Sequence, residues 1–141
     1  MKIMLIVKAN EDSESGRMPT TEELAEMGAY NEELANAGVL LAGEGLLPSS
    51  TGARVSFTGQ GASTVTEGPF AGVGELVAGY WIIDVASKED AVAWARRIPF
   101  GEGGEVEVRK VAEAEDFGEA FTPELREAEA DLRARTAERL H

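Results

Sequence analysis

The sequence contains no cysteine and a single histidine, and these two absences restrict its chemistry more than any motif does. Without cysteine there is no disulfide, no thiol nucleophile and no thiolate metal site. The one histidine is the last residue, His141, and a chain end does not hold an imidazole at catalytic geometry. Serine–histidine triads, histidine bases and histidine-ligated metals are therefore excluded. Any acid–base chemistry falls to carboxylates, tyrosines or lysines.

Basic residues are also few, since 13 lysines and arginines face 26 acidic residues, for a formal net charge of −13. Such a surface repels phosphate backbones and anionic lipid heads, so we expect no nucleic-acid or membrane partner. The acidity itself needs no explanation beyond solubility. The apolar run at 3–7 has only five residues, which is shorter than the roughly 7–15 of a signal peptide core. We therefore expect a cytoplasmic protein.

The pattern of apolar residues predicts one α+β domain followed by a helical tail. With 141 residues and 43% hydrophobic content the chain is able to bury one core. Strands are expected at residues 2–8, 39–42, 54–58, 63–66, 79–85 and 105–111. Helices are expected between the first two strands and before the last one, with a hairpin inserted at 54–66. This order is the split plan of ferredoxin-like folds.

Local signals set the expected ends of these elements. Thr20 is a helix cap, with Glu23 three residues later completing a capping box, and Gly38 ends that helix in a left-handed conformation. Ser87 caps the second helix. In the hairpin, strict alternation predicts that Val55, together with Phe57, points inward.

Two helices cover only one face of such a sheet, yet the strands at 2–8 and 79–85 carry apolar residues on both faces. A second copy of the chain is the natural cover, so a homodimer is expected. We divide the chain into an α+β domain at 1–111 and a tail at 112–141. The tail is an acidic linker and an amphipathic helix, which lies on the body, on a partner, or free in solvent.

Five segments, taken in order, resemble the DGPF branch of the YCII-related family. They are AGVL at 37–40, GEGLLP at 43–48, EGPFA at 67–71, GYWIIDV at 79–85 and GEVEVR at 104–109. The resemblance runs from about residue 2 to residue 111 and implies a ferredoxin-like, dimeric α/β barrel with two sheets facing each other. Glu67 stands where the family motif has an aspartate, so a carboxylate is kept on a longer side chain.

What the family implies about activity is limited. Most DGPF proteins have no established reaction, and relatives often adjoin extracytoplasmic-function sigma factors. Some YciI-type relatives use a histidine–aspartate pair, one of them to remove chloride from a hydroxylated aromatic. That histidine has no counterpart in this sequence, so their chemistry does not carry over.

The candidate catalytic residue is Glu67, in the turn before Pro69. It is either a carboxylate at a pocket, acting as a base, or a loop cap that accepts backbone N–H groups. Glu44 lies between two glycines, and a buried glutamate there needs Arg54 or Arg109 as its partner. That pair is either structural or an anchor for a carboxylate or phenolate ligand.

The remaining candidate ligand contacts are aromatic or lie on the last strand. Tyr80 and Trp81 point to opposite sheet faces, so one meets the helices and the other faces the barrel interior. Phe70 belongs to the same predicted ligand wall. Glu107 and Arg109 share the face away from the core. No glycine-rich phosphate loop is present, and neither a metal nor a cofactor is expected.

Three functions follow, in order of preference. The first is a small-molecule binding protein or enzyme with a pocket inside the barrel, for a carboxylate or phenolic ligand. The second is a regulatory protein that presents its dimer and its C-terminal helix to a transcription factor. The third is an isomerase or lyase that uses carboxylates alone.

Overall fold

A computed structural model describes residues 1–139; Leu140 and the terminal His141 lie outside the described residues. The chain forms two compact units, one from Met1 to Lys110 and the other from Val111 onward. Each unit is treated by itself below.

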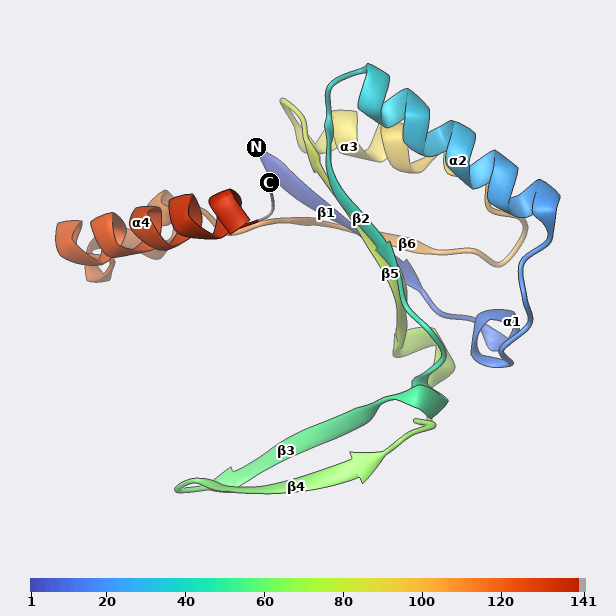
Figure 1. Cartoon of the computed structure of the whole chain (residues 1–141), viewed down its shortest axis with the longest axis horizontal. Helices are drawn as coiled ribbons and strands as arrows, with labels where there is room; N and C mark the ends of the chain where they lie inside the picture. Colours follow the sequence, from blue (N-terminus) through green and yellow to red (C-terminus); the bar gives the residue numbers. More distant parts are fainter. Residues whose placement is uncertain (140–141) are drawn as a thin grey trace. The chain divides into compact units, whose positions relative to one another are not determined.

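The first unit is built on a four-stranded sheet in the order β2-β5-β1-β6, with every neighbouring pair antiparallel. The strands are β1 (Lys2–Lys8), β2 (Leu40–Gly45), β5 (Val77–Asp84) and β6 (Val106–Lys110). Helix α2 (Thr21–Asn36) joins β1 to β2, and α3 (Lys88–Ala95) joins β5 to β6. Both helices cover the same face of the sheet (Figure 1). The α+β class is confirmed, and the connectivity is that of the split plan, but both sheets within residues 1–139 are open and form no barrel.

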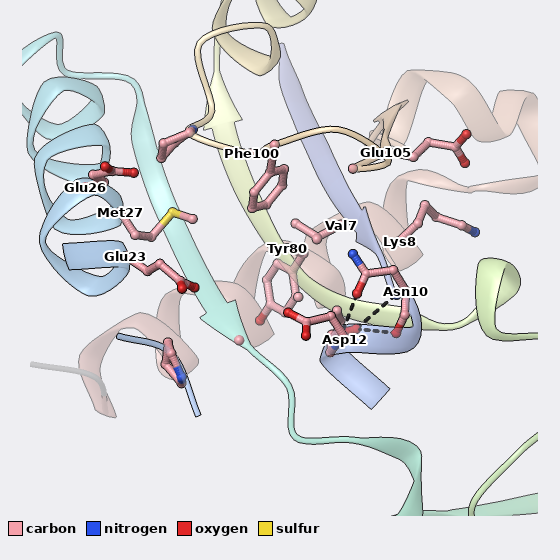
Figure 2. Close-up of a pocket in the computed structure, with 18 of the residues that line it drawn as sticks. Val7, Lys8, Asn10, Asp12, Glu23, Glu26, Met27, Tyr80, Phe100 and Glu105 are labelled. Carbon is pink, nitrogen blue, oxygen red and sulfur yellow. Dashed lines mark hydrogen bonds between the residues drawn. The ribbon is translucent and has the colours of Figure 1, made fainter. Parts of the chain in front are cut away.

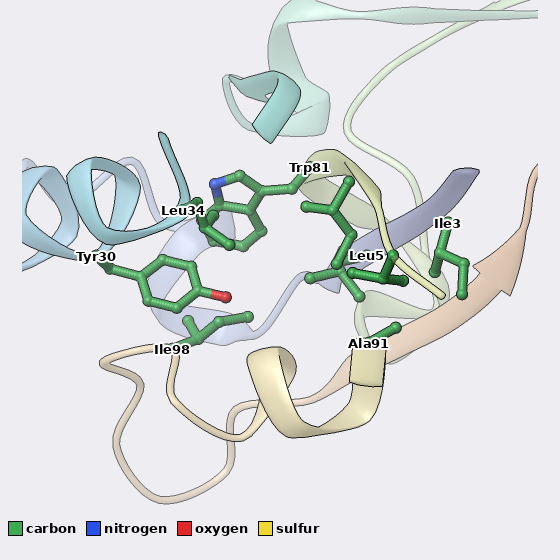
Figure 3. Packing of buried hydrophobic residues seen from close by; sticks show 9 residues of the cluster. Ile3, Leu5, Tyr30, Leu34, Trp81, Ala91 and Ile98 are labelled. Carbon is green, nitrogen blue, oxygen red and sulfur yellow. The ribbon is translucent and has the colours of Figure 1, made fainter. Parts of the chain in front are cut away.

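The core lies between this sheet and the two helices, as Figure 3 shows. Alternate residues of the central strands face it, so Ile3 and Leu5 of β1 and Ile83 of β5 are all at most 1% exposed. Burying each such side chain stabilises the fold by about 1.5–3 kcal/mol. Val106 and Val108 of β6 pack against the same cluster.

Tyr30 of α2 is a core residue that the sequence pattern did not reveal. It is 3% exposed, and its ring meets Trp81 edge-on with centroids 5.5 Å apart. Its hydroxyl donates a 2.8 Å hydrogen bond to the carbonyl of Trp94. Because that hydroxyl has a partner, tyrosine is tolerated in the core.

The expected helix starts are confirmed. Thr20 accepts a hydrogen bond from the N–H of Glu23 at 3.1 Å, and Ser87 accepts one from the N–H of Asp90 at 3.1 Å. Gly38 follows α2 with φ of 74°. The prediction of a complete capping box is wrong. The Glu23 carboxylate binds Arg17 and does not accept the backbone N–H of Thr20.

The expected hairpin is formed by β3 (Ala53–Gly59) and β4 (Ala62–Glu67), which make a separate two-stranded sheet. The expectation that Val55 and Phe57 point into a core is wrong, since they are 53% and 85% exposed. Figure 1 shows the reason: the hairpin projects away from the helices and the main sheet of its own unit. Its alternation therefore produces an apolar side that nothing within residues 1–110 covers.

Short helical turns occupy the loops. The segment 10–17 contains α1 (Glu11–Glu14), which Asn10 and Ser13 cap reciprocally. Two 3₁₀ turns, η1 (Ser49–Thr51) and η2 (Val73–Glu75), flank the hairpin in sequence. The first of them, η1, brings the hairpin base against α1 through Ser49.

The second unit consists of a 3₁₀ segment, η3 (Ala114–Ala120), and α4 (Pro123–Arg139). The rings of Phe117 and Phe121 pack edge-on with centroids 5.7 Å apart. Two ion pairs between residues four positions apart lie along α4, Glu129 with Arg133 at 2.8 Å and Asp131 with Arg135 at 3.0 Å. No helix in residues 1–139 is long and apolar enough to cross a membrane.

Candidate functional site

The first unit contains a cavity of about 810 Å³ at the end of the main sheet where β1 finishes and β5 begins. Residues from α2, from the segment 8–17 and from the loop 99–105 line it. In Figure 2, Glu23 and Glu26 extend from α2 on one side, Phe100 lies above, and Asp12 lies below. Because β2 and β5 also contribute, one cavity collects residues from five separate stretches of the sequence.

Aromatic and sulfur-containing side chains form its apolar wall. Trp81 is 6% exposed, and Phe100, which is 39% exposed, lies beside it with ring centroids 6.5 Å apart. Met27 of α2 lines the same wall. Gly43 leaves room for the indole, because a Cβ there would lie 2.9 Å from Trp81 Cδ1. The indole N–H donates to Asn31 Oδ1 at 2.8 Å, which fixes the ring.

Arg17 is the most tightly held charge on the rim. Its Nε bonds Asp12 at 2.9 and 3.0 Å, and its Nη2 bonds both carboxylate oxygens of Glu23 at 3.0 Å. Hydrogen bonds to Asp12 and then to Glu23, with their charges, raise the pKa of Arg17 above its usual range. The guanidinium is therefore already neutralised by two carboxylates.

Other carboxylates on the rim have no such partner. Glu26, Glu44, Glu102 and Glu105 line the cavity, and within the described chain none of them forms an ion pair. Lys8 is the second basic residue of the lining. The acidic groups are spread around the opening, and in residues 1–139 no three of them come close enough to hold a metal ion.

Three of the sequence-predicted site residues line this cavity: Glu44, Tyr80 and Trp81. Trp81 is the one of the aromatic pair that meets the helices, and Tyr80 stands opposite Ile6 and Glu44 on the neighbouring strands. The expectation of a buried Glu44 paired with an arginine is wrong. Glu44 is exposed because β2 is the edge strand of the sheet, and water solvates its charge there.

The other predicted site residues lie outside the cavity in two separate pairs. Arg109 bonds Glu107 at 3.1 Å on the sheet face that carries no helix, and both side chains are exposed. Arg54 stacks over the ring of Phe70, with the guanidinium carbon 4.1 Å from the centroid. Neither pair brings its arginine to Glu44.

Glu67 is the last residue of β4 and stands opposite Ala53. It is exposed, and in residues 1–139 its carboxylate accepts no hydrogen bond, so the loop-cap interpretation is wrong. The loop after it is held by other residues. Gly68 donates to the carbonyl of Gly52 at 2.9 Å, and the N–H of Phe70 donates to Ser49 Oγ at 3.0 Å.

Ser49 and Glu14 form a contact that the sequence did not indicate. The Glu14 carboxylate accepts the Ser49 N–H at 2.9 Å and the Ser49 hydroxyl at 2.6 Å. These bonds favour the charged carboxylate and lower the pKa of Glu14, against a smaller opposing effect of burial. A chain of hydrogen bonds therefore runs from α1 through η1 to the loop at 68–70.

Comparison with known families identifies the domain. The family model described as the YCII-related domain matches residues 1–115. The chain belongs to the YCII-related family. A search of the curated proteins found no match. The family match includes every residue that lines the cavity and ends before α4, so the cavity is part of the YCII-related domain itself.

Proposed function

We propose that this YCII-related protein binds a small organic molecule in the cavity beside α2. One observation carries the proposal: the cavity of about 810 Å³ combines an aromatic wall with a polar rim. Pockets for small molecules are commonly of about 300–1,000 Å³ and show this combination. The wall is also preformed, because the Trp81 indole is held by Asn31.

Each part of the lining has a role in this proposal. The exposed face of Phe100, backed by Trp81, receives the flat or apolar part of the ligand. The carboxylates of Glu26 and Glu102 accept its hydrogen bonds. If the protein also catalyses a reaction, these carboxylates are its acid–base groups, which corresponds to an isomerase or lyase without a cofactor.

The two tryptophans allow a direct test. In a ¹H–¹⁵N spectrum each gives one indole N–H signal, and only Trp81 lines the cavity. Fragments from a screen of small aromatics should shift the Trp81 signal, leave that of Trp94 in place, and lose affinity in the Phe100→Ala variant. A screen in which no fragment shifts Trp81 contradicts the proposal.

We further propose that the protein is a homodimer and that its partner covers the open face of the sheet, as in the barrel of the DGPF branch. Met4, Ile6 and Ile82 are half-buried there, and no helix of the first unit covers them. A lone subunit exposing this surface would tend to associate. Light scattering should give twice the 15.0 kDa of one chain, and Ile6→Glu should reduce it to one. A wild-type mass of 15.0 kDa at micromolar concentration is the contrary result.

The interior of that barrel is a second possible binding place, with Glu67, Glu107 and Arg109 as its polar groups. Glu67→Gln separates the two places. It should leave binding in the cavity beside α2 unchanged, because Glu67 does not line it. Loss of fragment binding in Glu67→Gln, with Phe100→Ala unaffected, would move the site to the barrel.

A regulatory role is the competing function, and one feature of α4 favours it. Leu125 and Leu132 are 53% and 50% exposed and stand two turns apart, so they share one side of the helix. Such a side is suited to a protein partner, of which a sigma factor is the example that the family suggests. A sigma factor retained by the wild-type chain and released by Leu132→Glu would support this role.

A further inference from the structure

The charges around the cavity specify the kind of ligand. We infer that the cavity selects a cationic organic molecule, an amine attached to an aromatic or apolar group. This inference rests on the proposed function, because it assigns a substrate class to the same cavity. It differs from the sequence-based expectation of a carboxylate or phenolate ligand.

The first argument is the balance of free charge. Of the six carboxylates in the lining, Asp12 and Glu23 are bound to Arg17. The other four have no ion pair within the described residues, and against them stands only Lys8. A cation that enters the cavity meets an excess of negative charge at short range, where attraction is strongest.

The second argument is the absence of an anion anchor in the lining. Binding a carboxylate or phenolate calls for an arginine with free N–H groups. The Nε and Nη2 groups of Arg17 already donate to two carboxylates of the protein. Neither Arg54 nor Arg109 is among the lining residues. An anionic ligand would displace existing ion pairs and would also face the unpaired glutamates.

The third argument is the aromatic wall. Phe100 offers an exposed ring face next to the indole of Trp81, and a cation over such a face gains electrostatic attraction from the ring. An apolar group attached to the amine would pack on the same wall and on Met27. Because the carboxylates are spread around the opening and do not converge on one point, they are suited to an organic cation and not to a bare metal ion.

The test uses three compounds with the same phenyl ring and different charge: phenethylamine, 2-phenylethanol and phenylacetate. Titration calorimetry with the full-length protein at pH 7 and low salt should give the tightest binding for phenethylamine, by about tenfold over 2-phenylethanol, and the weakest for phenylacetate. Raising the salt concentration should reduce the preference for the amine. The Trp81 indole signal should report binding at the cavity.

Matched variants on α2 separate the cavity from the general acidity of the protein. Glu26 lines the cavity, whereas Glu32 on the same helix does not, and both are exposed. Glu26→Gln should weaken the binding of phenethylamine several-fold and leave the binding of 2-phenylethanol unchanged. Glu32→Gln removes the same charge and should change neither. In a double variant, Glu26→Gln with Glu102→Gln, the affinity for phenethylamine should fall to the affinity for 2-phenylethanol.

The outcomes distinguish two claims: that the cavity binds a small molecule, and that it prefers a cation. If 2-phenylethanol or phenylacetate shifts the Trp81 signal at least as strongly as the amine, the cavity binds ligands but the cation preference is wrong. If equal losses follow Glu26→Gln and Glu32→Gln, the preference comes from net charge alone and is also wrong. If none of the three compounds binds, the cation inference is overturned, while the fragment screen decides independently whether the cavity binds anything.

Discussion

The Glu14 carboxylate accepts both the backbone N–H and the hydroxyl of Ser49, at 2.9 and 2.6 Å, although the two residues are 35 positions apart. The same Ser49 Oγ accepts the N–H of Phe70 at 3.0 Å. A four-residue helix, a 3₁₀ turn and the loop after the hairpin are therefore joined by one serine side chain. This junction sets where the hairpin leaves the domain.

The junction should weaken in acid. Because Ser49 lowers the pKa of Glu14 below its ordinary 4.5 in the folded state, the unfolded state binds the proton more readily. The stabilisation is therefore present above about pH 4.5 and lost as the pH falls through the folded-state value. Urea unfolding should show Glu14→Gln with a lower midpoint than wild type at pH 7, and the difference between the two midpoints should shrink as the pH is lowered below 4.5. Glu11→Gln, in the same turn, serves as the control, and a pH-independent difference would contradict the assignment.

Gly68→Ala should destabilise the domain. A Cβ at this position would lie 1.7 Å from the carbonyl oxygen of Ser49, so the backbone of η1 would have to move. Overpacking of this kind costs about 1–3 kcal/mol. Gly28→Ala is the counterpart, because Gly28 lies inside α2 with nothing within 4 Å of a new Cβ. It should stabilise the protein by about 0.5–1 kcal/mol, and denaturant unfolding measures both changes.

The core should resist alkali until Tyr30 ionises. Burial raises the pKa of Tyr30 to about 12, above its ordinary value of 10.0. Stability is then fully present below pH 10.0 and declines as the pH rises towards 12. Tyr30→Phe should be less stable at pH 7 by about 1 kcal/mol, because it loses the bond to Trp94, but should keep its stability between those pH values. Equal alkaline losses in both proteins would show that another group is responsible.

Asn31→Leu should loosen the cavity wall. The Trp81 N–H is buried and would lose its acceptor, at a cost of about 1–3 kcal/mol. Asn31→Asp keeps an acceptor oxygen and should cost less. The Trp81 indole proton should move upfield in the leucine variant and stay near its wild-type position in the aspartate variant. An unchanged indole signal in both would show that the hydrogen bond is not formed in solution.

Residues 1–112 should fold without the tail. Every residue of the hydrophobic core lies between Ile3 and Ile98, and α4 has no buried residue. A chain ending at Ala112 should keep the sharp thermal transition and the fragment binding of the full protein. Loss of cooperative unfolding in this chain would show that the tail is part of the core.

The sequence predicted the elements well because their signals are local. The apolar runs at residues 2–8 and 79–85, the caps Thr20 and Ser87, and Gly38 each depend on neighbours within a few positions, and all appear in the structure. Tyr30 was missed because its burial depends on Trp94, which is 64 positions away and supplies the hydrogen-bond acceptor. Val55 and Phe57 were misplaced because alternation shows which residues share a side of a strand, not whether anything covers that side.

The site was harder to predict for the same reason. Glu44, Tyr80 and Trp81 were found because they lie in strands with clear patterns. Phe100 and Arg17 lie in loops and Asp12 lies in the four-residue helix α1, where no periodicity places a side chain. Phe100 reaches the cavity only because the loop 99–105 passes over the end of the sheet. Six carboxylates around one opening were likewise hidden within a sequence that is acidic throughout.

The uncovered side of the hairpin also determines how its amide protons exchange with solvent. Paired strands that no other part of residues 1–110 covers open readily, so the amides of Val55 and Val65, which face each other across β3 and β4, should exchange quickly in a solitary chain. A second molecule laid over this ribbon would slow them by orders of magnitude while leaving the amides of Ile3 and Ile83 as they were. Amide exchange at these two valines therefore measures association without a determination of molecular mass.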